Sequence, residues 1–325
     1  MKNTLHVSHR CTSSNGEIAH DFFPLIREYK DGRVERFKDH DFVPPSLDPC
    51  SGVSSKDVVI APETGISARL YLPSTTYYPH RKIPLLAYLH GGAFCIESAF
   101  SSTYHRFVSS LVAEAHVVHP LPTAYDDCFE ALKWVASHSK GDGPEAWLND
   151  HVDFDRVFLA GDSAGANLAH YVAMRVGESR VDGLNKNKLI GLVLIHPYFE
   201  VKEPLGPEAS DEEKKAKVGK LWQYLCPSII GCNDPKINPA ADPKISGLGC
   251  RQVGIWVAEK DFLREKGGLL YYEVVKKSGW GGVAEVIEEE GEDHVFHLVK
   301  PDSEKAVAMT KRLAAFLNHH YQDKV

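Results

Sequence analysis

Short apolar runs and amphipathic stretches alternate along the chain from about residue 55 to its end. Apolar runs typical of buried strands cover residues 67–73, 83–90, 156–163, 189–199 and 254–261. Apolar residues recur at helical spacing over 102–115, over 124–137, in the stretch after Ser163 and over 306–317. Strands that alternate with helices predict an α/β fold, in which a mostly parallel central sheet is covered by helices on both faces.

Polar segments interrupt this alternation. The polar composition of residues 1–17 predicts that they form a mobile tail. Residues 22–37 then predict two short strands, or a strand and a turn, around Asp31-Gly32, which is a common signal for a hairpin turn. Residues 200–240 are rich in proline, glycine and charge, and they predict an excursion over the sheet. The chain contains no internal repeat, so we expect a single domain over residues 18–325.

Composition and charge exclude several other classes of protein. With 325 residues, 43% of them hydrophobic, the chain is long enough to bury a sizeable core. The net charge of −7 and the lack of a basic block give no sign of a nucleic-acid partner. No apolar run reaches the roughly 18 residues of a membrane span, and the N-terminus lacks the apolar stretch of a secretory signal. The seven cysteines form no CxxC pair, so a reducing cytoplasm is expected and a zinc or disulfide framework is not.

The predicted strand at 156–163 leads into the turn Gly161-Asp162-Ser163-Ala164-Gly165. A G-x-S-x-G turn between a strand and a helix strains its serine and directs the hydroxyl away from the sheet. Its two glycines let the strand and the helix pack closely, and the helix N-terminus attracts developing negative charge. We therefore interpret Ser163 as a candidate nucleophile supported by Gly161, Asp162 and Gly165. The alternative is an ordinary glycine turn around a buried serine.

A second glycine-rich turn, His90-Gly91-Gly92-Ala93, follows another predicted strand. Acyl transfer requires preorganised N–H donors around the oxyanion, and a glycine-rich turn can direct backbone N–H groups outwards. The predicted oxyanion hole comprises Gly91, Gly92 and Ala93, together with Ala164 after the candidate nucleophile. His90 is expected to hold the loop rather than to act as a base. The alternative is a tight loop without a catalytic task.

The partners of such a serine follow it in the order acid and then histidine. Asp261 comes just after a predicted strand, and His294 lies in a loop before the last helix, so both fall at the carboxyl edge of the sheet. His294 would take the proton of Ser163, and Asp261 would fix the tautomer of His294 and stabilise its charged form. His297 is a nearby competitor that we expect instead to pack on the terminal helix.

These motifs resemble a known family. The stretches are YLHGGAFCIESAFSSTYHRFVSSLVAEA, HPLPTAYDDCFEALKWVASH, WLNDHVDFDRVFLAGDSAGANLAH, VAEKDFLREKG and GEDHVFHL. They resemble plant class I carboxylesterases of the hormone-sensitive-lipase type, which have the α/β-hydrolase fold. The resemblance runs from about residue 22 to the C-terminus. It implies a small cap from about residues 18–50 and 200–240 over an apolar pocket, a cytoplasmic location, and no metal or other cofactor.

The resemblance also implies the reaction. Small or medium apolar carboxylic esters, such as plant secondary metabolites, would be hydrolysed through an acyl-enzyme on Ser163. The stretch HGGAFCIESAFS looks especially like 2-hydroxyisoflavanone dehydratases and their esterase relatives. Those dehydratases carry threonine at the nucleophile position, so Ser163 favours hydrolysis, although the same histidine and oxyanion hole can serve an elimination. Gibberellin receptors of similar sequence have lost the catalytic histidine, and His294 therefore argues against a receptor.

The chain departs from the family after Val118, which runs directly into His119. Family members have a full strand there and a further segment before His-Pro-Leu-Pro. The remaining strand, near 116–119, would be truncated to about 10 Å, against a usual length of about 17–20 Å. Because this strand lies inside the sheet, its neighbours would lose ladder partners. The alternatives are a mis-spliced or mispredicted chain, a variant in which the helix at 102–115 shortens to extend the strand, and a degenerate, inactive copy.

Overall fold

The chain divides into two compact units, residues 1–39 and residues 40–325. The structure is a computed structural model, and it describes residues 16–37, 41–49, 51–74, 82–115, 125–184, 189–201, 220–226 and 233–318.

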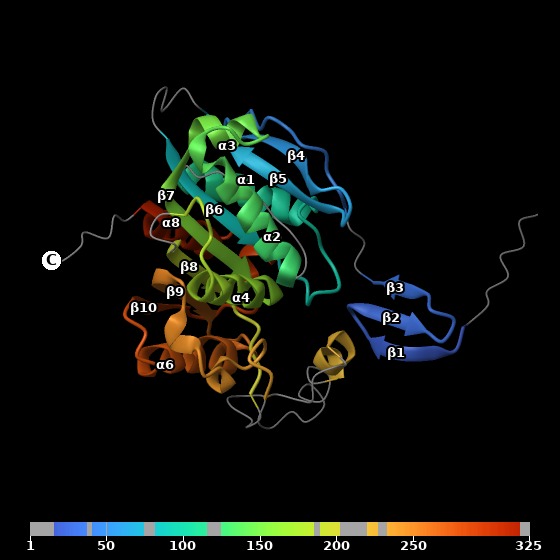
Figure 1. Ribbon diagram of the computed structural model, residues 1–325. Coiled ribbons are helices and arrows are strands. Elements are labelled where there is room, and N and C mark those ends of the chain that lie inside the picture. The colour runs from blue at the N-terminus through green and yellow to red at the C-terminus, as the bar shows by residue number, and fades with distance from the viewer. Residues whose placement is uncertain are drawn as a thin grey trace, which may run out of the picture. The chain divides into compact units, whose positions relative to one another are not determined.

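The smaller unit contains a three-stranded antiparallel sheet in the order β1-β2-β3 (Figure 1). Its strands are β1 (Ile18–Phe22), β2 (Ile26–Tyr29) and β3 (Val34–Arg36). Gly32 lies in the turn between β2 and β3 with a φ of 85°, a conformation that glycine adopts without a Cβ clash. The hairpin predicted around this glycine is confirmed, and β1 is a further strand that the sequence pattern did not reveal.

The larger unit contains a five-stranded parallel sheet in the order β10-β9-β8-β7-β6 (Figure 1). Its strands are β6 (Ile83–Leu89), β7 (Val152–Asp162), β8 (Leu189–Ile195), β9 (Cys250–Ala258) and β10 (Val283–Glu289). The first four coincide with predicted apolar runs, so the predicted parallel sheet is confirmed. β10 was not predicted, because it is an edge strand with several exposed positions and glutamates in place of an apolar run.

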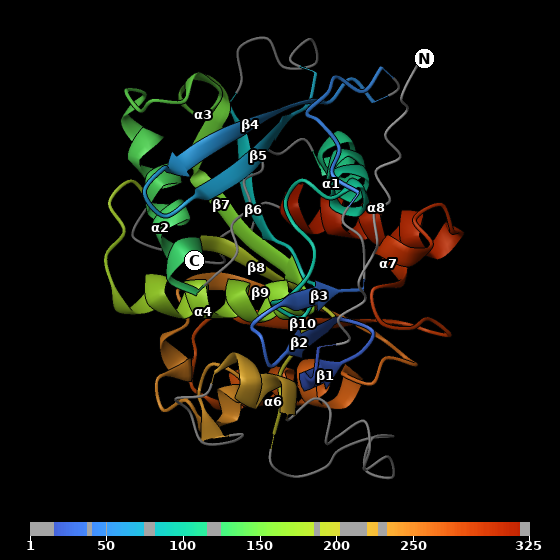
Figure 2. The ribbon, with the colours of Figure 1, turned by 90° about the vertical axis from the view of Figure 1, so that its right-hand side faces the viewer.

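Helices cover both faces of this sheet, as the alternation predicts (Figure 2). The long helices are α1 (Ser102–Ala115), α2 (Tyr125–Ala136), α4 (Ala164–Glu178), α6 (Leu270–Lys277) and α8 (Glu304–Asn318). α1 and α8 pack on one face, and α2, α4 and α6 pack on the other. Successive side chains of β7 alternate between the faces, so Phe158 packs with α1 and α8 while Leu159 packs with α2 and α4. Shorter helical segments are α3 (Ala146–His151), α7 (Phe296–Val299), 220–225, Ser137–Lys140, Pro239–Ala241, Ile245–Gly247 and Arg264–Leu269.

The sheet is divided between β5 and β6. β4 (Ser54–Ala61) and β5 (Ile66–Leu72) form an antiparallel pair of their own. Within the described residues β5 pairs only with β4 and β6 only with β7, although β6 is buried along its whole length. The truncated strand predicted near 116–119 falls outside the described residues. α1 keeps the full helix at 102–115, so the alternative in which this helix shortens is wrong.

The predicted cap stays a prediction. Its first segment, 18–50, crosses the boundary between the two units, and much of its second segment, 200–240, falls outside the described residues. In the part of the chain that the structure describes, no helix has the length and apolar character needed to span a membrane.

Candidate active site

Ser163 lies in a sharp turn between β7 and α4, as the G-x-S-x-G motif predicts. Its φ of 52° and ψ of −118° are strained for a residue with a side chain. The turn needs its glycines, because a Cβ on Gly165 would lie 1.9 Å from the carbonyl oxygen of Leu89 in β6. The backbone of Ser163 is also fixed, since its N–H donates to Ile195 O (2.8 Å) and its carbonyl accepts the N–H of Tyr198 (3.0 Å). The strained turn is therefore held between β6 and β8.

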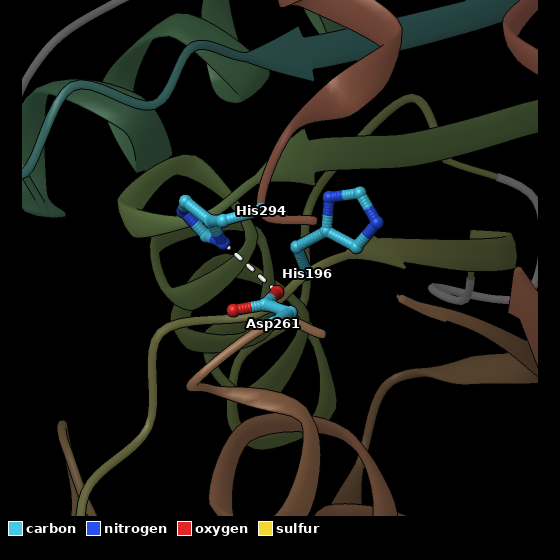
Figure 3. A group of neighbouring side chains, drawn as sticks. All are labelled: His196, Asp261 and His294. Atoms are coloured by element: carbon cyan, nitrogen blue, oxygen red, sulfur yellow. Dashed lines mark hydrogen bonds and ion pairs between the residues drawn. The ribbon is translucent and has the colours of Figure 1, made fainter. Parts of the chain in front are cut away.

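The structure brings Ser163, His294 and Asp261 together from three separate loops. His294 Nε2 lies 3.0 Å from Ser163 Oγ. His294 Nδ1 lies 2.9 Å from Asp261 Oδ2 (Figure 3). The other carboxylate oxygen of Asp261 accepts the N–H of Leu263 (2.8 Å), which fixes the carboxylate at the end of β9. The Asp261 side chain is fully buried, and that of His294 is 21% exposed. This is the geometry of a serine, a base and the group that orients the base.

The charges around His294 set its proton affinity. Burial lowers the pKa of His294, but the Asp261 carboxylate attracts the charged ring and accepts its Nδ1–H, and Asp162 and Asp293 add further attraction. The net pKa of His294 lies above its ordinary value of 6.5. His294 is therefore a stronger base than free imidazole, because its surroundings stabilise the protonated ring more than the neutral ring.

The loop after β6, which the glycine-rich motif predicts to be an outward-turned loop, lies against the turn that carries Ser163. Gly92, Ala93 and Phe94 have φ values of 98°, 53° and 61°, a left-handed run that only glycine adopts readily. Within the described residues, the N–H groups of Gly92, Ala93 and Ala164 donate no hydrogen bond. Unpaired backbone N–H groups are the donors that an oxyanion requires.

Gly91 has a different place from the one predicted. Its N–H donates to the Tyr104 hydroxyl (2.8 Å) and to Asp162 Oδ1 (3.1 Å), so it is already engaged and is not free to bind an oxyanion. These bonds correct the prediction that groups Gly91 with the residues around the oxyanion. The neighbouring His90 is buried, and its Nδ1 lies 2.9 Å from Gly91 O within the same loop.

Asp162 ties this loop to the turn that carries Ser163. Its buried carboxylate accepts the hydroxyls of Tyr88 (2.7 Å) and Tyr104 (2.8 Å) as well as the N–H of Gly91. Burial raises the pKa of Asp162 to about 6, and the two tyrosine hydroxyls partly offset this rise. Sequence reasoning missed the two tyrosines, because nothing in their local pattern distinguishes them from other buried aromatic residues.

His196 is a second residue near the site that the sequence did not single out. It follows β8 directly, and its ring lies beside the His294–Asp261 pair (Figure 3). The polar atoms of His196, Asp261 and His294 lie within 4.8 Å of one another, close enough to suggest a metal site. Hydrogen bonds already use Nδ1 of His196, which accepts the N–H of Val295, and both ring nitrogens of His294, which bridge Asp261 and Ser163. The donor set fits a proton-transfer site better than a metal site.

Two further observations complete the surroundings. His297 is buried against Phe107 of α1 and against His196. The short α7 that carries it contacts both α1 and α8, so its predicted packing on the last helix stays a prediction. An apolar cluster adjoins the site: it contacts Phe94 of the outward-turned loop and includes Tyr198, whose N–H binds Ser163 O. The members of this aromatic wall are Phe94, Tyr125, Tyr198, Trp222, Cys226, Ile237, Phe262 and Leu263.

Comparisons with known proteins cover most of the chain. A family model described as "alpha/beta hydrolase fold" matches residues 86–298. The chain is 43% identical over 319 residues to probable carboxylesterase 2 of Arabidopsis thaliana, covering 94% of this chain and 98% of that protein. It is also 43% identical over 319 residues to the chloroplastic tuliposide A-converting enzyme 2 of Tulipa gesneriana, covering 94% of this chain and 80% of that protein. Among solved structures, a hyperthermophilic esterase from the archaeon Pyrobaculum calidifontis has a TM-score of 0.62 at 26% identity, covering 81% of this chain and 84% of that one. The segment matched by the family model includes Ser163, Asp261 and His294.

Proposed function

We propose, from the premise that this chain belongs to the α/β-hydrolase family and within it to the plant carboxylesterases, that it hydrolyses small or medium apolar esters with Ser163, His294 and Asp261 as a catalytic triad. The chain is a serine hydrolase of the carboxylesterase type. The observation that carries the proposal is the unbroken chain of short contacts from Ser163 Oγ through His294 to Asp261.

The mechanism follows from these contacts. Ser163 Oγ attacks the ester carbonyl carbon while His294 Nε2 takes the hydroxyl proton, and Asp261 stabilises the imidazolium that forms. The tetrahedral oxyanion receives the N–H groups of Gly92, Ala93 and Ala164. His294 then returns the proton to the leaving alcohol oxygen, which produces the acyl-enzyme. A water molecule, deprotonated by His294, attacks the acyl carbon. The bond to Ser163 Oγ then breaks, His294 gives the proton back to Oγ, and the acid is released.

The aromatic wall supports the proposed substrate class. It begins at Phe94, the residue after the proposed oxyanion donors, and Phe262 lies 5.4 Å from the His294 ring between their centroids. An acyl or alcohol group that packs against this wall gains about 25 cal/mol for each Å² of apolar surface removed from water. We therefore propose that the ligand is a small-molecule ester, such as a plant secondary metabolite. The relatives above do not favour the dehydratase alternative.

Location is a separate proposal. The tulip relative is named as chloroplastic, whereas the cysteine usage of this chain favours a cytoplasmic location.

A serine-reactive fluorophosphonate tests the proposal without a choice of substrate. The purified chain is labelled and the adduct is located by mass spectrometry, with Ser163→Ala as the matched control. We expect a stoichiometric adduct on Ser163 and none in the control. A folded, monodisperse chain that forms no adduct would overturn the proposed function and favour an inactive copy. Hydrolysis of p-nitrophenyl acetate, butyrate and palmitate then tests the substrate class, and fastest turnover of palmitate would contradict it.

A further inference from the structure

A hydrogen bond joins two strained residues behind the proposed base. His196, directly after β8, has a φ of 47°, and Val295, directly after His294, has a φ of 48°. Positive φ is uncommon for residues other than glycine and is an outlier for a β-branched residue such as valine. The N–H of Val295 donates to His196 Nδ1 at 3.0 Å, across 99 positions of sequence. Strained residues persist only where their surroundings hold them, and this bond is the contact that holds the turn after His294 to β8.

His196 is itself held rigidly. Its backbone N–H donates to Trp256 O of β9 (2.8 Å), and its side chain is almost completely buried. Its ring centroid lies 5.8 Å from that of His294, 5.8 Å from that of Phe296 and 5.5 Å from that of His297. His196, whose Nδ1 accepts the N–H of Val295, is therefore anchored to the sheet and its packed core and does not lie on a free loop.

We propose that His196 is a positioning residue of the active site: by accepting the N–H of Val295, its Nδ1 fixes the left-handed turn that aims His294 at Ser163. The proposal rests on the proposed function of the triad and adds to it the residue that sets the place of the base. A misplacement of about 1 Å can lower the rate of an enzyme about 100-fold, so the turn at Val295 has a direct consequence for turnover.

The protonation state of His196 agrees with this role. Burial lowers the pKa of His196 well below 6.5, and His297 lowers it further. Asp261 raises it by less than either, and His294 adds a still smaller lowering. His297 is also held neutral by burial, with a pKa of about 3. A neutral His196 keeps Nδ1 as an acceptor. It also places no second positive charge beside His294 when that ring takes the proton of Ser163.

Two substitutions at His196 separate positioning from packing. His196→Asn retains an acceptor close to the Nδ1 position and tolerates a positive φ, whereas His196→Phe retains a ring and removes the acceptor. His297→Phe is the matched control, because it changes an adjacent buried imidazole that has no hydrogen-bond partner among the described residues. The measurements are kcat and KM on p-nitrophenyl butyrate, the pH profile of kcat/KM, and the thermal midpoint of each variant.

We expect His196→Phe to lower kcat about 10- to 100-fold with little change in KM. The acid limb of its kcat/KM profile should move to lower pH, because a displaced His294 loses part of its attraction to Asp261, the nearest of the charges that raise its pKa. His196→Asn and His297→Phe should stay within about threefold of the wild type. The proposal fails if His196→Phe keeps the wild-type kcat and pH profile, or if His196→Asn loses as much activity as His196→Phe.

Two additions keep the test decisive. If His196→Phe does not fold, His196→Gln replaces it, since the longer side chain carries its carbonyl beyond the Val295 N–H. Proton NMR of the Nδ1–H of His294 reports the bond to Asp261 without any turnover. We expect its downfield resonance in the wild type and in His196→Asn, and its loss or weakening in His196→Phe. If the wild type neither turns over esters nor takes the fluorophosphonate, the proposed function fails, and the resonance alone decides whether His196 positions His294.

Discussion

The carboxyl edge of the five-stranded sheet and the boundary between β5 and β6 are built in opposite ways. At the carboxyl edge, Ser163, His294, Asp261 and Asp162 each make hydrogen bonds to one another or to neighbouring loops. At the boundary, two largely buried strands each have a ladder partner on one side only, within the described residues. The proposed chemistry depends on β6 to β9, whereas among the described residues the side of β6 away from β7 has no ladder partner. We therefore expect activity and stability to respond to different substitutions.

The largest effect should come from Asp261→Asn at the carboxyl edge. An amide in this place cannot stabilise the imidazolium and favours the wrong tautomer of His294, so kcat should fall about 10⁴-fold. Steady-state kinetics measures the loss, and thermal unfolding should show a folded chain. Asp293→Asn is the matched control, because this exposed carboxylate binds the backbone N–H of His294 and not its ring. A loss of less than about tenfold in Asp261→Asn would contradict the triad.

Arg69→Met, in β5 at the boundary with β6, should instead lower the stability of the protein and leave its turnover unchanged. The guanidinium of Arg69 is buried in β5, where it binds both carboxylate oxygens of Asp57 (2.6 and 2.9 Å) and the carbonyl of Val43 (2.8 Å). Because Asp57 stays partly in solvent, we expect a loss of about 2–3 kcal/mol in the free energy of unfolding. Urea unfolding measures it, and Arg106→Met, which removes an exposed ion pair with Asp302, should cost under about 1 kcal/mol. A fall in turnover per fluorophosphonate-titrated site would show that the two regions are coupled.

Asp162→Asn should have a smaller effect, on both turnover and stability, because Asp162 joins β7 to the outward-turned loop. One amide oxygen cannot accept the hydroxyls of Tyr88 and Tyr104 and the N–H of Gly91 together, so the loop should loosen and kcat should fall about tenfold. The pKa of Asp162 is raised from 3.8 to about 6, so the folded state binds an extra proton between these values. Its contribution to stability is therefore present below pH 3.8 and is lost as pH rises through about 6. The free energy of unfolding, measured in urea across this pH range, should therefore depend less on pH in the variant than in the wild type. An equal pH dependence in the two proteins would contradict the raised pKa of Asp162.

The smallest effect requires no substitution. Turnover needs the neutral form of His294, whose pKa is raised above 6.5, so the rate should rise with pH through a midpoint above 6.5. At pH 6.5 kcat/KM should be less than about half of its plateau, which a pH profile on p-nitrophenyl butyrate measures. A midpoint below 6.5 would mean that the Asp261 carboxylate does not reach the base in solution.

The sequence alone predicted the elements whose pattern is strong. The runs at β6, β7, β8 and β9 are almost continuously apolar because both faces of a parallel strand are buried. β10 was not predicted, because an edge strand has fewer buried positions and the glutamates of β10 interrupt its apolar run. The short β1 was missed for a similar reason, because most of its residues are exposed.

For the site, the order of motifs along the chain was informative and the roles of single atoms were not. Residues that follow parallel strands meet at one edge, which is why Ser163 and Asp261 could be placed near each other before the structure was known. The direction of a single N–H could not be predicted: Gly91 donates inwards to Asp162, although the motif groups it with Gly92. The positive φ of His196 is likewise a tertiary effect, since the turn is held by contacts 99 positions away.

The packing of α1 against α8 also bears on how the protein is made. Both helices cover the same face of the sheet, and a core cluster joins residues of α1 to residues of α8 near the other end of the chain. During synthesis, which proceeds from the N-terminus, this apolar face stays uncovered until α8 has left the ribosome. A nascent chain would expose the apolar side chains of α1 for most of its translation. Chaperones that shield such surfaces are therefore expected to matter more for the yield of this enzyme than for its stability once it has folded.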